Sequence, residues 1–120
     1  MNVYAGDNKK MLNMLILEVL KEYTDDEHRL TQQEIIDRLK LNYGAECDRR
    51  SIRNNIRSLK DMGYEIATKR GCYLAERDFD DAELRMLIDS VLFSKNLSGT
   101  QAKRLIEKLK GFGNRYFHAK

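Results

Sequence analysis

Proline and tryptophan are absent from this 120-residue sequence, and cysteine and histidine each occur only twice. The absence of proline, which breaks helices, favours a helical fold. Two cysteines, Cys47 and Cys72, are too few for a disulfide framework, and with His28 and His118 they show no spacing typical of a zinc site. We therefore expect two reduced thiols that act as small packing residues, and no metal or other cofactor.

Long apolar runs are also missing. No stretch approaches the roughly 18 to 20 apolar residues of a membrane span, and the first ten residues, MNVYAGDNKK, lack the apolar core of a signal peptide. The sequence contains no glycine-rich phosphate loop and no nucleophile at a telling distance from a base. These absences predict a cytoplasmic protein that is not an enzyme, has no small-molecule site and makes no contact with a membrane.

The net charge of +3 is small, but it is unevenly divided along the chain. Residues 1–47 contain six basic and nine acidic side chains, whereas residues 48–70 contain seven basic and three acidic ones. Residues 71–95 are again acidic, with three against six, and residues 96–120 are basic, with six against one. Because local charge says more about partners than the total does, the two basic blocks are the candidate contact regions.

Apolar spacing and cap residues predict the first two helices. From residue 8 to 23 apolar residues recur at i, i+3, i+4 and i+7, and this face is wide enough that we expect a C-terminal helix to cover part of it. A second helix is expected over residues 32–41. Its start is given by Thr31 and Glu34, which have the spacing of a capping box, and Gly44 supplies a stop.

A third helix is expected over residues 49–62, after the cap residue Asp48. The alternating residues that follow, and a turn at residues 69–71, predict a short β-hairpin between residues 64 and 74. In the helix, three residues at i, i+4 and i+7 are expected to face the core: Ile52, Ile56 and Leu59.

Two further capping boxes begin at Asp80 and Ser98 and open helices that end near Ser94 and Gly111. Three helices, a hairpin and two more helices match a winged helix-turn-helix with a C-terminal extension. We therefore expect a mainly α fold with a small β-hairpin, divided into three parts. These are a DNA-binding winged helix-turn-helix (residues 1–77), a two-helix linker or dimerisation segment (residues 78–112), and a tail that leads into a further domain or is disordered (residues 113–120).

The third expected helix has an outward face suited to DNA. On a helical wheel Arg50, Asn54 and Arg57 lie opposite Ile52. Arginine can bond in bidentate fashion to guanine and asparagine to adenine, whereas serine can bind phosphate oxygens. Two further arginines and a serine of the same helix complete the candidate set: Arg49, Ser51 and Arg53.

Basic residues on the outer face of a helix usually only solvate it. Here Arg49 and Arg50 occupy the first turn, where the helix macrodipole disfavours each cation by about 0.3 to 1 kcal/mol. This local disadvantage suggests an external anion. Lys69 and Arg70, at the tip of the expected hairpin, supply a second basic element that could reach phosphate or the minor groove.

Three stretches, LTQQEIIDRL, DRRSIRNNIRSLKDMGYEI and GCYLAERDF, resemble the winged helix-turn-helix of the WYL-domain transcriptional regulators, which is DeoR-like. The stretch FDDAELRMLIDSVLFSKNLSGTQAKRLIEKLKGF is similar to the two-helix linker of that family. Where many members have an arginine–aspartate pair, this sequence has Asn54 and Asn55. The resemblance implies DNA contacts by the residues named above: Arg49, Arg50, Ser51, Arg53, Asn54, Arg57, Lys69 and Arg70.

The expected function is that of a sequence-specific module of a bacterial or phage transcriptional regulator that binds double-stranded DNA. The resemblance also implies a ligand-sensing WYL domain, which this chain lacks. We expect a homodimer formed through the first helix and the two C-terminal helices. The alternative is a winged helix that binds protein, such as a phage or mobile-element inhibitor that occupies an acidic partner surface.

Overall fold

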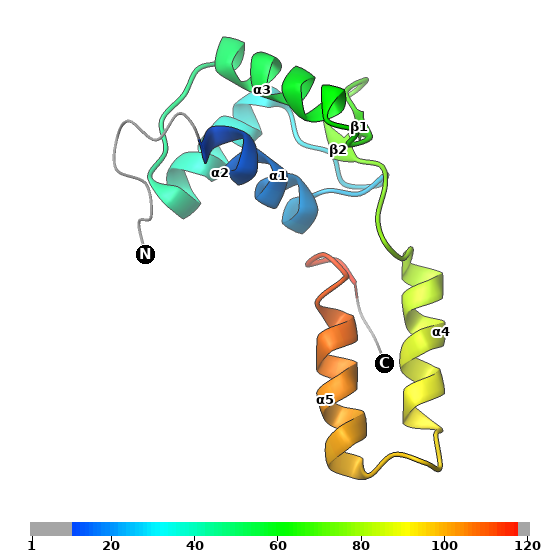
Figure 1. The fold of residues 1–120 in the computed structure, drawn as a ribbon. Coiled ribbons are helices and arrows are strands. Elements are labelled where there is room, and N and C mark those ends of the chain that lie inside the picture. The colour runs from blue at the N-terminus through cyan, green and yellow to red at the C-terminus, as the bar shows by residue number, and fades with distance from the viewer. Residues whose placement is uncertain (1–10, 118–120) are drawn as a thin grey trace. The chain divides into compact units, whose positions relative to one another are not determined.

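The computed structural model describes residues 11–117 and is mainly helical, with one small hairpin (Figure 1). The expected start of the first helix at residues 8–10, His118 and the end of the tail lie outside the described residues. The chain divides into two compact units, residues 1–76 (unit 1) and 77–120 (unit 2). The expected fold class is confirmed, with seven elements in the described part in this order: α1 (Leu12–Tyr23), α2 (Gln32–Tyr43), α3 (Arg49–Asp61), β1 (Ile66–Ala67), β2 (Tyr73–Leu74), α4 (Asp81–Leu92) and α5 (Gly99–Lys110).

The helices begin where the cap residues predict. The backbone N–H of Glu34 donates to the hydroxyl of Thr31 at 3.1 Å, and the Glu34 carboxylate accepts from the Thr31 N–H at 2.8 Å. The same reciprocal pair opens α4 and α5. Helix α2 runs two residues beyond its expected end, because the left-handed cap is at Gly44 itself, with φ of 68°.

The core of unit 1 is built on α1, which packs against α2, α3 and β2. Most of its apolar face is used there, and Leu17 is only 8% exposed. Leu17 is thus buried in the core of unit 1, whereas Met11 and Met14 stay exposed, and the expected C-terminal cover stays a prediction. The six buried α1 residues are Leu12, Leu15, Ile16, Leu17, Val19 and Leu20.

The hairpin is shorter than expected, because its two strands are two residues long. They are antiparallel, with Ile66 opposite Leu74 and Ala67 opposite Tyr73. The loop before α2 adds a further pair: the Cys72 N–H donates to the Leu30 carbonyl at 2.7 Å, and the Leu30 N–H donates to the Cys72 carbonyl at 3.0 Å. This contact joins the hairpin to the start of the helix-turn-helix.

Unit 2 is a pair of packed helices, α4 and α5. Leu84 and Ile88 are buried, whereas no residue of α5 is, and the rings of Phe79 and Phe112 meet edge to face at 5.4 Å. Two helices enclose little volume, so much of the apolar stripe of each stays in contact with solvent. Six large apolar side chains of this unit are exposed: Met86, Leu87, Leu92, Phe93, Leu105 and Phe112.

Candidate nucleic-acid interface

Helix α3 is fixed by its buried side and its cap. Ile52, Ile56 and Leu59 are buried, as their spacing predicts, so the other sides of the helix face outward. The carboxylate of Asp48 accepts a hydrogen bond from the Ser51 N–H at 2.8 Å. That backbone hydrogen bond is the main reason why the pKa of Asp48 lies below its ordinary value, since it stabilises the charged carboxylate.

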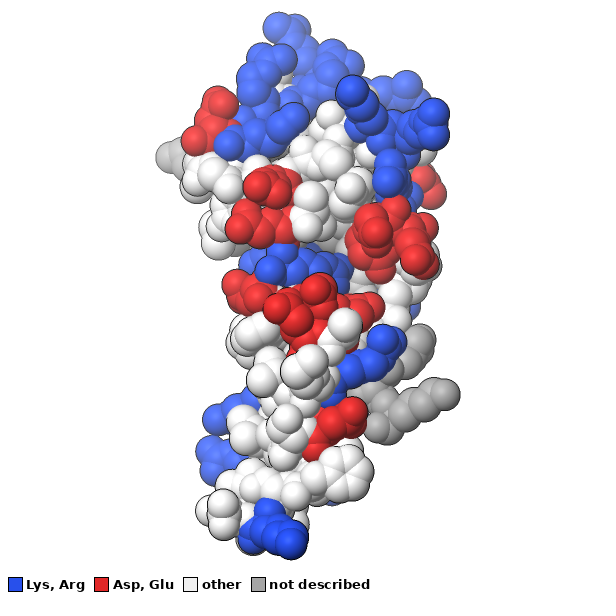
Figure 2. All heavy atoms as spheres, turned by 90° about the vertical axis from the view of Figure 1, so that its right-hand side faces the viewer, with Lys and Arg blue, Asp and Glu red and all other residues white. Residues whose placement is uncertain are grey.

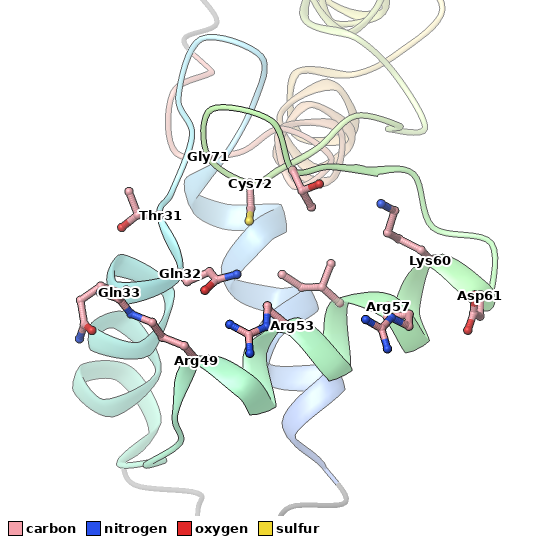
Figure 3. A pocket seen from close by; sticks show the side chains of 12 residues that line it. Thr31, Gln32, Gln33, Arg49, Arg53, Arg57, Lys60, Asp61, Gly71 and Cys72 are labelled. Atoms are coloured by element: carbon pink, nitrogen blue, oxygen red, sulfur yellow. The ribbon is translucent and has the colours of Figure 1, made fainter.

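Four cations of α3 form a row along one side of the helix. Arg49, Arg53, Arg57 and Lys60 follow one another at steps of four, four and three residues, which keeps them on one side. They line a groove of about 850 Å³ between α3, the first turn of α2 and the hairpin, and Figure 3 shows them side by side. The remaining lining residues are Thr31, Gln32, Gln33, Ile56, Asp61, Thr68, Gly71 and Cys72.

The groove takes in only part of the expected outward face of α3. Sequence spacing places Arg50, Asn54 and Arg57 at the middle of the outward face, but of these only Arg57 lines the groove. Arg50 and Asn54 are exposed on the adjoining outward side of α3. The structure therefore separates the expected α3 residues into two neighbouring sets, one in the groove and one beside it.

Asn54, Asn55 and Ser51 differ in how far they are exposed to solvent. Asn55 is half-buried, and its side-chain amide donates to the Ser51 carbonyl at 2.8 Å. Asn54 is exposed, and its backbone carbonyl accepts from the Ser58 hydroxyl at 3.1 Å. Ser51 is half-buried beneath the Asp48 cap, so it is less accessible than the arginines around it.

The hairpin places Lys69 and Arg70 at its exposed tip, as expected. Arg70 has a left-handed backbone with φ of 58°, followed by Gly71 with φ of 96°. Lysine and arginine side chains gather at the top of Figure 2, at the level where Figure 1 draws α3 and the hairpin of unit 1. The two basic elements therefore belong to one end of unit 1.

No cation of α3 or of the hairpin tip forms an ion pair within the described residues, although, after the Ser51 backbone hydrogen bond, Arg50 is among the groups that lower the pKa of Asp48. Within residues 11–117, ion pairs are formed by Lys40 with Glu46 at 3.4 Å and Lys110 with Glu107 at 3.6 Å. Neither these pairs nor any other ion pair of the described part includes a cation of α3 or of the hairpin tip. Asp61 is the one acidic side chain among those that line the groove. A concentration of unpaired positive charge on one surface favours an anionic partner.

The predicted site lacks six polar residues that line the groove, namely Thr31, Gln32, Gln33, Lys60, Asp61 and Thr68. The spacing from Arg49 through Arg57 could have indicated Lys60, which continues the same row. The glutamines and Thr68 gave no such signal, because their place beside α3 depends on how α2 and the hairpin pack.

The two thiols pack in or against the core of unit 1. Both cysteines are free, with Cys72 buried and Cys47 half-buried. Burial is the main cause that raises the pKa of each thiol, which keeps both protonated at neutral pH. No group of histidine, cysteine and acidic residues that could hold a metal ion occurs in the described part of the chain. No described helix is long and apolar enough to cross a membrane.

Three helices and a hairpin with a cationic groove between them define a winged helix-turn-helix with a basic surface. No family model matches the sequence, and no curated protein or solved structure matches it either. The geometry and charge of α3 and the hairpin are therefore the evidence on which a function can be proposed.

Proposed function

We propose that this protein is a sequence-specific DNA-binding module of a bacterial or phage transcriptional regulator. The observation behind the proposal is the row of Arg49, Arg53, Arg57 and Lys60, which has no acidic partner and lines the groove between α3 and the hairpin. In a winged helix-turn-helix the third helix enters the major groove of double-stranded DNA. The phosphate backbone is the anion that such a row of cations would neutralise.

The two sets of α3 residues suggest two roles. The groove row would hold the phosphates of the strand that passes between α3 and the hairpin, because charge without base-specific geometry positions a protein on DNA. Arg50 and Asn54, on the adjoining face, would reach base edges, since arginine recognises guanine and asparagine recognises adenine. Lys69 and Arg70 would contact the backbone or the minor groove beside the helix.

The resemblance to the WYL-domain regulators supports the same function, because it rests on the stretches that form α2, α3 and the hairpin. A regulator of this kind acts on DNA inside the cell, and we therefore propose a cytoplasmic protein.

We also propose a homodimer, formed chiefly by α4 and α5. The exposed apolar side chains of this unit, including Phe93 at 82% and Met86 at 70%, would be covered by the same unit of a second copy. Helix α4 has three acidic residues and one arginine, whereas α5 has four basic residues and one glutamate. A two-fold arrangement that sets α4 against α5 of the second copy would pair these charges, and would place half-sites about 34 to 36 Å apart or at multiples of that spacing.

A salt titration tests DNA binding directly. Binding of the full chain to duplex DNA, followed by fluorescence anisotropy at several salt concentrations, should give a linear fall of log K with log salt. Contacts to roughly four to eight phosphates predict a slope of about −4 to −7. A flat response, or no binding at low salt, would show that the basic surface has another partner.

The other candidate is a winged helix that binds an acidic protein surface, and its motivation is the same unpaired charge. Replacing Arg50 and Arg57 with alanine separates the two functions when the fold is verified by circular dichroism. Loss of DNA binding supports the DNA-binding function. DNA binding that survives this double replacement would point to the protein partner instead.

A further inference from the structure

Arg29, in the loop between α1 and α2, is a basic residue of unit 1 that contacts the hairpin. Its Nη1 donates to the Lys69 carbonyl at 3.2 Å, and its guanidinium carbon lies 4.6 Å from the centre of the Tyr73 ring. Its Nε donates to the Asp26 carbonyl at 3.1 Å. A single side chain thus joins its own loop to both sides of the hairpin turn.

The turn that Arg29 touches lies at the end of a very short hairpin. Each strand of the hairpin is two residues long, and so short a hairpin has little stability of its own. The tip also holds Arg70 in a left-handed backbone conformation, which an arginine rarely adopts. Contacts from outside the hairpin are therefore needed to keep this tip in one conformation.

Gly71 shows how closely the turn packs on the same residue. A Cβ atom added at Gly71 would lie 2.9 Å from the Cβ of Arg29 and 3.5 Å from the Leu30 carbonyl oxygen. Beside it, Cys72 and Leu30 exchange two backbone hydrogen bonds. The turn at Gly71 thus packs against the loop at Arg29 and Leu30. The Arg29 guanidinium contacts a residue on each side of this turn, Lys69 and Tyr73.

We propose that Arg29 is a positioning residue, which holds the hairpin tip so that Lys69 and Arg70 meet DNA in a fixed place. This inference rests on the proposed DNA-binding function. Two of the five guanidinium N–H donors bond to carbonyls and the cation stacks on a ring, so the contacts of Arg29 favour an action through the tip. A tip that is already ordered loses less conformational freedom on binding, and this improves affinity.

A positioning role and a direct phosphate contact predict different results for a lysine at this position. A phosphate contact needs positive charge, which Arg29→Lys retains. The bridge from Asp26 to Lys69 and the stack on Tyr73 need the planar, forked guanidinium, which lysine lacks. Arg29→Lys should therefore behave like Arg29→Ala if Arg29 positions the tip.

The test is a double-mutant cycle in the full chain, which combines replacement of the tip residues with replacement of Arg29. DNA binding of each variant is measured by fluorescence anisotropy on a duplex of about three helical turns. Replacing Lys69 and Arg70 with alanine should weaken binding on the order of tenfold and reduce the salt slope by about 1.8, for two lost phosphates. Arg29→Ala and Arg29→Lys should each weaken binding by about threefold to tenfold. Neither should weaken it further in the variant that already lacks both tip cations.

Arg38→Ala is the matched control, because Arg38 stacks on the Tyr23 ring at 4.3 Å but does not touch the hairpin. The affinity of the Arg38→Ala variant for the duplex should stay close to that of the unaltered chain. Wild-type affinity in Arg29→Lys, or a loss that adds to that of the tip variant, would instead make Arg29 a direct contact and overturn the inference.

Hydrogen exchange separates this inference from the proposed function. Without DNA, both Arg29 variants should speed exchange of the Cys72 amide, which is bonded to Leu30, whereas Arg38→Ala should not. Unchanged exchange at Cys72 would overturn the positioning role whether or not the chain binds DNA. Faster exchange in a chain that binds no DNA would leave Arg29 as the support of the tip and reject the DNA-binding function alone.

Discussion

The hydroxyl of Thr24 accepts a hydrogen bond from the backbone N–H of Leu74 at 3.0 Å and donates its own hydrogen to the Leu20 carbonyl. Thr24 is fully buried, and it follows the last residue of α1. This side chain therefore joins the C-terminal end of α1 to β2, the second strand of the hairpin. The position of the hairpin relative to α3 depends in part on this bond.

Replacing Thr24 with valine should destabilise unit 1. Valine keeps the shape but removes the acceptor, which leaves the buried Leu74 N–H without its partner, at a cost of about 1 to 3 kcal/mol. Urea unfolding followed by circular dichroism measures the loss. Thr68→Val is the control, because Thr68 is exposed and its replacement should change stability by less than about 0.5 kcal/mol. Equal stabilities for the two variants would contradict the role given to Thr24.

The two sets of α3 residues should differ in their effect on DNA binding. Arg53→Gln removes a cation of the groove row, so it should weaken binding to all sequences alike and reduce the salt slope by about 0.9. Arg50→Gln should reduce discrimination between sequences by about 1 to 3 kcal/mol at one base pair. Binding-site selection from a random library, combined with salt titration, measures both effects.

Lys40→Gln is the charge-matched control for these variants, because Lys40 is exposed and pairs with Glu46. Its sequence preference and salt slope should stay unchanged. An Arg53 variant with altered sequence preference, or an Arg50 variant with a uniform loss of affinity, would reverse the assignment of the two sets.

The cap of α3 should make stability depend on pH in the acid range. The pKa of Asp48 lies below its ordinary value of 3.8 in the folded chain, because its carboxylate accepts the Ser51 backbone hydrogen bond. The stabilisation is therefore complete above the ordinary pKa and is lost as the pH falls through the lower, folded value. Asp48→Asn keeps a capping side chain without a titratable charge, so its stability should fall less over this range.

Thermal unfolding at a series of pH values, from neutral to below 3.8, tests this prediction. The difference in Tm between the unaltered chain and Asp48→Asn should be constant at neutral pH and should change only on acidification. Parallel curves through the whole range would show that the Asp48 charge contributes nothing to the cap.

The proposed dimer should dissociate when the exposed apolar surface of α4 is made polar. Phe93 and Met86 line the same shallow surface depression, so replacing both with serine removes apolar contact area without disturbing the buried Leu84 and Ile88. We expect a monomer by sedimentation equilibrium, and weaker binding to duplexes that contain two half-sites. Leu41→Ser is the control, because Leu41 is 75% exposed but belongs to unit 1. A dimer that persists in the double variant would place the interface elsewhere.

Local signals in the sequence were sufficient for the helices and for the buried side of α3. Cap residues act within three or four positions of the helix start, so Thr31, Asp48, Asp80 and Ser98 could be recognised without knowledge of the fold. The order of helices and hairpin then predicted the winged helix-turn-helix. The excess of basic residues over 48–70 identified the surface, although not its shape.

Contacts between distant segments were decided only by the tertiary structure. The pairing of Leu30 with Cys72, the bridge from Arg29 to Lys69 and the hydrogen bond from Leu74 to Thr24 join residues about 40 to 50 positions apart, where the local sequence pattern has no influence. For the same reason helical periodicity could show which side of α3 is buried, but not which outward side lies beside the hairpin. Packing of α2 and the hairpin against α3 made the row from Arg49 to Lys60 the wall of a groove.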